Sequence, residues 1–198
     1  MATVAKLSRT AESPVAGEKE PGIVTHPLLI DTETLQQQLG QSGVVIIDVR
    51  GKAAYEFGGH IPGAVHSTWH EYSDPNAVAK GLLNPALGQS ERILQRLGIN
   101  QDSDVVIYSN PFDNWGDEGR MFWMLDYLGH TRLRILDGGW VKWTAEKRPF
   151  EHGSVSPTRG NFKAQARRDL IALKDDDLKG LVRGPHPKTA ILDARSVE

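Results

Sequence analysis

The run Val45-Ile46-Ile47-Asp48-Val49-Arg50 decides the fold that this sequence predicts. Its first residues are apolar and β-branched without alternation, which is typical of a strand buried on both faces of a parallel sheet. We therefore expect a strand at Val44–Ile47. Val105–Tyr108 and Leu133–Leu136 have the same character and are expected to be further strands of that sheet.

Segments with helical periodicity lie between these strands. In Arg120–Leu128, apolar side chains recur at the three- and four-residue spacing that gives a helix one apolar face. The alternation of strands and helices predicts an α/β fold with a mostly parallel central sheet flanked by helices. The expected helices are Thr32–Leu39, Ala53–Phe57, Glu91–Leu97, Arg120–Leu128 and Trp140–Glu146.

Composition argues against several classes of function. Lys and Arg number 23 against 25 Asp and Glu, a net charge of −2, so no basic field attracts nucleic acid or anionic lipid. No run approaches the roughly 18 apolar residues of a membrane span, and the first 25 residues lack an apolar leader core. We expect no nucleic acid partner, no membrane partner and, by default, a cytoplasmic location. The sequence has no cysteine, which excludes disulfides, thiolate metal sites and thiol nucleophiles within it.

The chain divides into four segments. Residues 1–25 lack periodicity and are expected to form a mobile tail. Residues 26–149 hold the strands and helices of one domain. Residues 150–165 contain proline and glycine with few large apolar side chains, so we interpret them as a linker. Residues 166–198 are interpreted as the beginning of a second unit.

An internal repeat supports that second unit. Ala190-Ile191-Leu192-Asp193-Ala194-Arg195 matches the run at 45–50, about 145 residues further along the chain. The pattern of residues 170–178 matches that of residues 29–35 in the same order. Two ordered matches favour a duplicated domain. Because so short a segment cannot close a core, we expect the second unit to be incomplete here.

Several motifs in order carry a resemblance to a known family. After the run at 45–50 come Tyr55-Glu56, Gly59-His60-Ile61-Pro62-Gly63-Ala64, Val106-Ile107-Tyr108 and Leu136-Asp137-Gly138-Gly139-Trp140. This set resembles the rhodanese superfamily of sulfurtransferases. Residues 191–198 resemble the opening of a second rhodanese-like domain.

The resemblance implies a tandem thiosulfate or 3-mercaptopyruvate sulfurtransferase. In that family a carboxy-terminal domain carries the catalytic cysteine, and the amino-terminal domain is inactive. A thiolate takes up sulfane sulfur as a persulfide and passes it to a thiophilic acceptor such as cyanide or a thiol. The implied partners are a second rhodanese domain in cis and a small sulfur-containing anion, and no cofactor is expected.

Ser109 stands at the position of the family's cysteine. A hydroxyl is not appreciably ionised near neutral pH and cannot form a persulfide, so we expect this chain alone to be inactive. The catalytic cysteine would then lie beyond Glu198. A hydrolase role for Ser109 is disfavoured, because no Gly-x-Ser-x-Gly elbow surrounds it.

Arg120 is the candidate residue for binding a substrate anion. The loop before it holds Asp113, Asp117 and Glu118, whose negative charge would repel thiosulfate or mercaptopyruvate. We expect Arg120 to pair with Asp117 or Glu118 at the start of its helix.

The other motif residues are interpreted as structural. Asp48 and Arg50 are spaced for mutual or loop-directed hydrogen bonding at a strand end. His60 is expected to bond nearby backbone in a turn, and Gly138-Gly139-Trp140 to form a tight turn with aromatic packing. His60, His66 and His70 lack the spacing of a metal motif, so no metal site is expected.

One alternative class of function remains open. The serine at position 109, the acidic loop and the lack of cysteine also fit a non-catalytic binding or regulatory module. Pro111-Phe112 and Trp115 place apolar side chains on the loop, which suggests contact with another domain.

Overall fold

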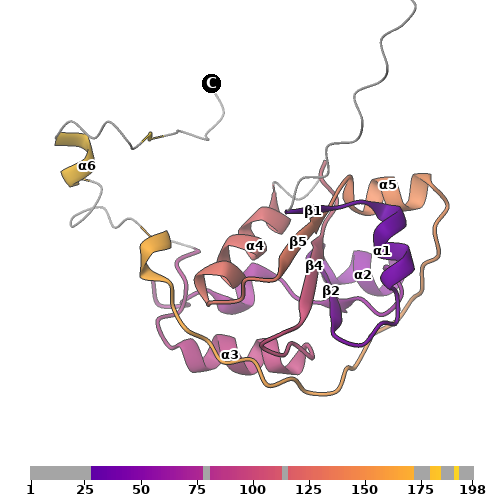
Figure 1. Ribbon diagram of the computed structural model, residues 1–198, viewed down its shortest axis with the longest axis horizontal. Coiled ribbons are helices and arrows are strands. Elements are labelled where there is room, and N and C mark those ends of the chain that lie inside the picture. Colours follow the sequence, from indigo (N-terminus) through magenta and orange to yellow (C-terminus); the bar gives the residue numbers. More distant parts are fainter. Residues whose placement is uncertain (1–27, 78–80, 113–115, 172–178, 184–189, 192–198) are drawn as a thin grey trace, which may run out of the picture.

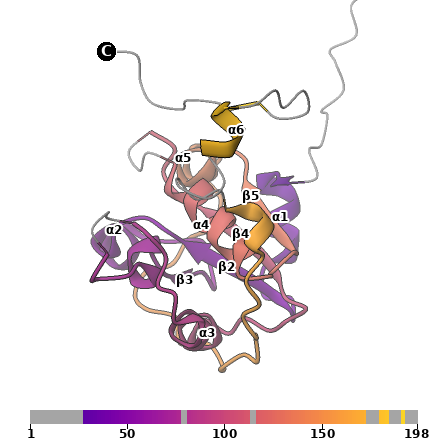
Figure 2. The ribbon, with the colours of Figure 1, turned by 90° about the vertical axis from the view of Figure 1, so that its left-hand side faces the viewer.

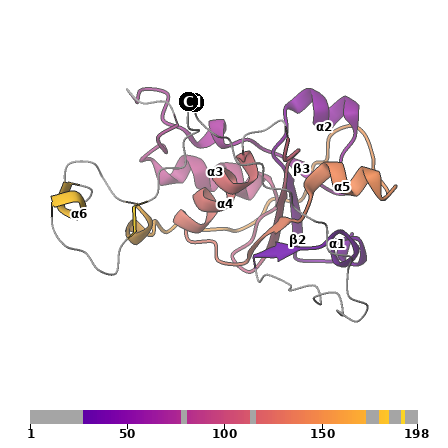
Figure 3. The same cartoon turned by 90° about the horizontal axis from the view of Figure 1, so that it is seen from above.

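The computed structural model describes residues 28–77, 81–112, 116–171, 179–183 and 190–191. A sheet of five strands lies between two layers of helices, with α1, α2 and α5 on one side and α3 and α4 on the other (Figures 1 and 3). Its strand order is β1-β5-β4-β2-β3, and every neighbouring pair is parallel. The predicted α/β fold with a parallel central sheet is confirmed.

The bounds of the elements are as follows. The strands are β1 (Leu29–Ile30), β2 (Val44–Asp48), β3 (Val65–His66), β4 (Asp104–Tyr108) and β5 (Leu133–Leu136). The α-helices are α1 (Thr32–Gln38), α2 (Lys52–Gly58), α3 (Leu87–Arg96), α4 (Asp117–Tyr127), α5 (Gly139–Ala145) and α6 (Lys179–Arg183). Two short 3-10 helices are η1 (Trp69–Tyr72) and η2 (Arg168–Leu170). In the part of the chain that the structure describes, no helix has the length and hydrophobicity needed to span a membrane.

The core has two parts, one on each face of the sheet. Leu35 of α1 and Trp143 of α5 pack on one face, whereas Leu94 of α3 and Met121 of α4 pack on the other. All four side chains are fully buried. The continuous apolar character of the central strands therefore reflects burial on both faces.

Several predicted boundaries differ from the observed ones. The strands β1 and β3 were missing from the predicted set, because two residues are too few to show periodicity. Helix α3 starts at Leu87 rather than Glu91, and α4 starts at Asp117 rather than Arg120. The first turn of α4 carries Asp117 and Glu118, and carboxylates are favoured at a helix N-terminus.

The segment predicted as a linker, residues 150–165, packs along the first domain. Phe162 is fully buried in the core cluster that also contains residues of α3 and α4. The N–H of Gly160 donates to Gln95 at 2.7 Å, and that of Gln165 donates to Leu128 at 2.8 Å. Figures 1 and 2 both show this segment passing α3 on its way to η2. Its role in joining two domains stays a prediction.

Some predictions fall outside the described residues. The tail at 1–25, the loop residues Asp113 and Trp115, and most of the repeat at 190–195 lie there.

Candidate functional site

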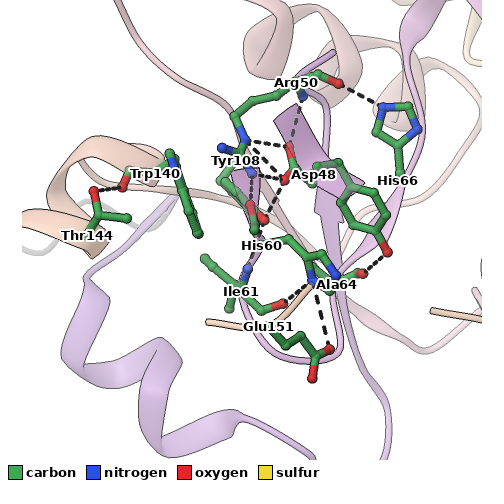
Figure 4. Close-up of polar contacts among 12 residues, drawn as sticks. Asp48, Arg50, His60, Ile61, Ala64, His66, Tyr108, Trp140, Thr144 and Glu151 are labelled. Carbon is green, nitrogen blue, oxygen red and sulfur yellow. Dashed lines mark hydrogen bonds and ion pairs between the residues drawn. The ribbon is translucent and has the colours of Figure 1, made fainter. Parts of the chain in front are cut away.

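The carboxyl ends of β2 and β4 meet at one edge of the sheet. Asp48 at the end of β2 is in register with Tyr108 at the end of β4, and Ser109 follows directly. Open α/β sheets place their sites at such strand ends. The arrangement brings three of the predicted motif residues, Asp48, Arg50 and Trp140, into one network (Figure 4).

Asp48 and Arg50 form a buried ion pair. The Asp48 carboxylate accepts the backbone N–H of Arg50 at 2.9 Å and its Nη2 at 2.6 Å. The Tyr108 hydroxyl donates to the same carboxylate at 2.7 Å. Burial and the Asp48 charge raise the pKa of Tyr108 well above its ordinary value, so the phenol remains a donor. The mutual bonding predicted from the spacing of Asp48 and Arg50 is therefore present, and Tyr108 is a member that the sequence analysis missed.

Arg50 also ties this network to the neighbouring turn and helix. Its Nη2 donates to the carbonyl of Gly59 at 2.6 Å, and its guanidinium lies over the Trp140 ring at 4.2 Å. The buried charges of Asp48 and Arg50 are compensated within the fold. This arrangement supports a structural role.

His60 is enclosed beneath the segment that follows α5. It is fully buried, and its two ring nitrogens lie 3.1 Å from the Ile61 carbonyl and 3.0 Å from the Gly153 carbonyl. Its ring stacks on that of Tyr55 with centroids 4.2 Å apart. Backbone hydrogen bonds run in both directions between His60 and Glu151, at 2.8 and 2.9 Å. His60 thus bonds to backbone, as expected for a turn histidine.

The other two histidines of the sequence motif do not join His60. His66 bonds the Arg50 carbonyl through Nε2 at 2.8 Å, and His70 stacks on Trp69. Among the described residues, no group of three or more metal-ligating side chains comes together.

Ser109 lies in a small hollow at the end of β4. Its side chain is buried, and its Oγ donates to the Glu118 carboxylate in the first turn of α4. The carbonyl of Ser109 accepts the N–H of Trp140 at 2.9 Å. The hollow measures about 190 Å³, and none of its lining residues is a histidine. The lining residues are Leu29, Ser109, Pro111, Glu118, Ile135, Leu136, Asp137, Gly138 and Gly139.

The turn at Gly138-Gly139 depends on both residues being glycine. Gly138 and Gly139 have φ of +75° and +53°, a conformation that other residues rarely adopt. A Cβ on Gly139 would lie 2.3 Å from the Ser109 carbonyl oxygen. The predicted tight turn therefore also fixes the backbone of Ser109.

The predicted pairing of Arg120 with Asp117 or Glu118 is wrong. Asp117 accepts the indole N–H of Trp69 at 2.8 Å, and Glu118 accepts Ser109. Arg120 donates to the Gly81 carbonyl, and its guanidinium lies 5.5 Å from the ring centre of Trp69 and 4.9 Å from that of Trp123. Tertiary partners have replaced the local ion pair, and burial lowers the pKa of Arg120.

Arg120 lines a second and larger hollow of about 840 Å³. Its walls are largely apolar, and they include Leu170 and Ile171, the last described residues before position 179. Sequence reasoning missed this hollow because its walls come from η1, α4 and loops far apart in the chain. Its other lining residues are Trp69, Gly81, Leu82, Leu83, Asn84, Pro85, Leu87, Gly116, Asp117, Trp123, Tyr127 and Arg168.

The two hollows hold different candidate residues. Ser109 and Glu118 line the small one, whereas Arg120 and Asp117 line the large one. The two residues singled out for substrate chemistry, Ser109 and Arg120, thus line different hollows of the described part of the chain.

Comparison with known proteins gives one consistent result. The family model described as Rhodanese-like domain matches residues 31–146. The chain is 30% identical over 174 residues to the sulfur carrier protein TtuD of Thermus thermophilus, and 31% identical over 175 residues to a thiosulfate sulfurtransferase of Azotobacter vinelandii. Each alignment covers 86% of this chain but only 59% and 60% of the respective relative.

A solved structure agrees with these alignments. SseA from Escherichia coli, whose description names the rhodanese fold and the mechanism of 3-mercaptopyruvate sulfotransferases, superposes with a TM-score of 0.65 and 25% identity. The match covers 78% of this chain and 60% of SseA. This chain therefore spans about three fifths of the length of all three proteins.

Proposed function

Because the chain belongs to the rhodanese-like family, we propose that it forms the first, non-catalytic domain of a sulfurtransferase with two such domains. The observation that carries this proposal is Ser109. It stands at the expected position of the thiol, buried at the end of β4 and hydrogen-bonded to Glu118. An oxygen nucleophile cannot hold sulfane sulfur as a persulfide, so this domain does not perform the transfer itself.

In the whole protein, sulfane sulfur would pass from thiosulfate or 3-mercaptopyruvate to a cysteine and then to a thiophilic acceptor. This chain has no cysteine, so that residue would lie beyond Glu198. Two observations support a second unit in cis. One is the repeat at 190–195, and the other is that this chain covers only 59% and 60% of the two relatives.

Arg120 remains the candidate residue for binding a substrate anion. Its guanidinium lies near the rings of Trp69 and Trp123. This environment suits a ligand that carries both an anionic group and an apolar group better than a small sulfur anion. A cytoplasmic location and the lack of a nucleic acid partner also stay predictions, which fractionation of the source cells and a binding assay at low salt would test.

A second candidate function is a non-catalytic binding module. The large hollow favours it, because apolar walls surround a half-buried cation and provide a site for an aromatic or aliphatic anion. A fluorescent aromatic sulfonate, 8-anilinonaphthalene-1-sulfonate, is a suitable probe. Arg120→Met should weaken its binding about tenfold, roughly 1.4 kcal/mol. Arg92→Met, at an exposed position of α3, is the matched control and should leave binding unchanged.

One measurement separates the two functions. The intact mass of the protein from its natural source is compared with the 21.8 kDa of this chain. A mass of roughly 32 kDa, as a completed repeat implies, supports the sulfurtransferase. A mass near 21.8 kDa would contradict it and leave the binding module.

A further inference from the structure

The contact between Ser109 and Glu118 places a carboxylate beside residue 109 at the start of α4. Glu118 belongs to the first turn of α4, an 11-residue helix whose N-terminus follows Gly116. The first-turn N–H groups of a helix have no partner within the helix, and the partial positive charge there favours an anion. In this chain a carboxylate of the helix itself lies there and accepts the hydroxyl of Ser109.

The two charged residues that line the small hollow are both acidic. They are Glu118 and Asp137, and no Lys or Arg is among the described residues that line this hollow. Asp137 is compensated, because Lys142 Nζ lies 2.7 Å from it. Glu118 forms no ion pair within the described part of the chain, and its partner there is the uncharged Ser109. An anion entering this hollow would therefore meet an uncompensated negative charge.

We infer that Glu118 is a second block on sulfur transfer at this position, separate from the missing thiol. Its carboxylate belongs to the first turn of α4 and contacts residue 109, where a thiolate and an anionic substrate would have to lie. Glu118 is not a catalytic residue in this scheme, because its charge acts on the group at position 109 and on the incoming anion without taking part in the transfer. The inference rests on the proposed function only for the choice of sulfur transfer as the chemistry.

A cysteine introduced at position 109 could take sulfur from thiosulfate in one step, and this is the step that Glu118 would oppose. Its thiolate would attack the outer sulfur of thiosulfate. A new S–S bond would form on the cysteine, the S–S bond of thiosulfate would break, and sulfite would leave with the bonding pair. Both reactants are anions, and a nearby carboxylate raises the pKa of a thiol by disfavouring the thiolate. Glu118 would thus oppose both the formation of the nucleophile and the approach of the donor.

The natural lack of cysteine makes this testable with a single thiol. Three variants are compared: Ser109→Cys, Ser109→Cys with Glu118→Gln, and Ser109→Cys with Glu33→Gln. Glutamine keeps an acceptor at position 118 but removes the charge. Glu33 is the matched control, because it is an exposed carboxylate in the first turn of α1.

The readouts are the pH dependence of alkylation by iodoacetamide and the intact mass after exposure to thiosulfate. In the single variant, the thiol pKa should lie above the ordinary value of about 8.5, with no sulfur gained. Removal of the Glu118 charge should raise the alkylation rate at neutral pH about tenfold, equivalent to about one pKa unit. The double variant should also gain one sulfur atom from thiosulfate. The control with Glu33→Gln should behave as the single variant.

Equal alkylation rates with and without the Glu118 charge, in folded proteins, would overturn the inference. So would persulfide formation by Ser109→Cys alone. If the cysteine variants do not fold, Glu118→Gln in the cysteine-free chain supplies an independent test. Thiosulfate should raise the melting temperature of that variant and not that of the natural chain, and equal shifts would contradict the block.

This test and the test of the proposed function can fail separately. The proposed effect of the Glu118 charge concerns residues of this chain alone. If that effect is not observed, a downstream catalytic domain is still possible. A natural mass near 21.8 kDa would remove that domain and leave the block intact.

Discussion

The guanidinium of Arg50 lies over the indole of Trp140, 4.2 Å from the ring centre. Arg50 follows β2, and Trp140 is the second residue of α5, so this contact joins two elements that are distant in the sequence. The Trp140 ring also stacks near Tyr108, with centroids 6.3 Å apart. The contact therefore covers the buried Asp48 network at the carboxyl edge of the sheet.

Trp140→Ala should lower the free energy of unfolding by about 2 kcal/mol, because it removes the cation–π contact and aromatic packing. Urea denaturation measures this change. Trp140→Phe keeps an aromatic face beneath Arg50 and should cost clearly less. If the two variants were equally destabilised, the ring contact would not be the cause.

Asp48→Asn should cost about 3 kcal/mol, since it leaves the buried Arg50 without its charge partner. Combining it with Arg50→Met removes both charges. The double variant should be less destabilised than the sum of the two single variants, as measured by denaturant midpoints. Additive effects would show that the pair is not coupled.

Gly139→Ala should destabilise the protein far more than Gly63→Ala. Both glycines have positive φ, at +53° and +77°, so both substitutions carry the cost of that backbone conformation, about 1 kcal/mol. A Cβ at position 139 also meets the Ser109 carbonyl at 2.3 Å, whereas a Cβ at position 63 has nothing within 4 Å. Thermal melting compares the two, and similar melting temperatures would disprove the clash.

Acid should destabilise the fold through His130. This residue is fully buried, and burial lowers its pKa below the ordinary value of 6.5. The unfolded chain therefore binds a proton at a higher pH than the folded chain. Stability is unaffected above about pH 6.5 and is lost as the pH falls from there towards the folded pKa. Urea midpoints at about pH 7.5 and pH 5 measure this loss.

Variants assign the acid effect to one residue. His130→Asn should show a smaller difference between the two pH values than the natural chain, although its overall stability is lower. His152→Asn, at an exposed position, should keep the full difference. A difference that survives His130→Asn would assign the effect to other groups.

The purified 198-residue chain should produce no thiocyanate from thiosulfate and cyanide, because it has no thiol to carry sulfur. A tandem thiosulfate sulfurtransferase in the same buffer shows that the assay works. Turnover by the pure chain would contradict the role proposed for Ser109.

The sequence was sufficient to predict the central strands and the type of fold. Val105–Tyr108 and Leu133–Leu136 were predicted from continuous apolar runs, which follow directly from burial on both faces. The two-residue strands β1 and β3 could not be predicted in this way. Strand β1 is defined by its pairing with β5, far along the chain, and β3 by its pairing with β2 across an intervening helix.

The side-chain partners were harder to predict than the elements. Asp48 and Arg50 are two residues apart, so their local spacing was informative. Arg120 also had nearby carboxylates, but Trp69 and Gly81 became its partners through tertiary structure. Local spacing predicts a contact only when no distant group competes for the same side chain.

The anchoring of Phe162 has a practical meaning for where the first unit ends. A chain cut at Pro149 would lose the Phe162 side chain from the core beside α3 and α4, and would uncover His60. A chain cut after Arg167 would keep both, and would also keep the bond from the Arg167 N–H to the Tyr127 carbonyl at 2.7 Å. Protein engineers who exchange or fuse this unit should therefore splice after Arg167, some distance beyond the last residue matched by the family model.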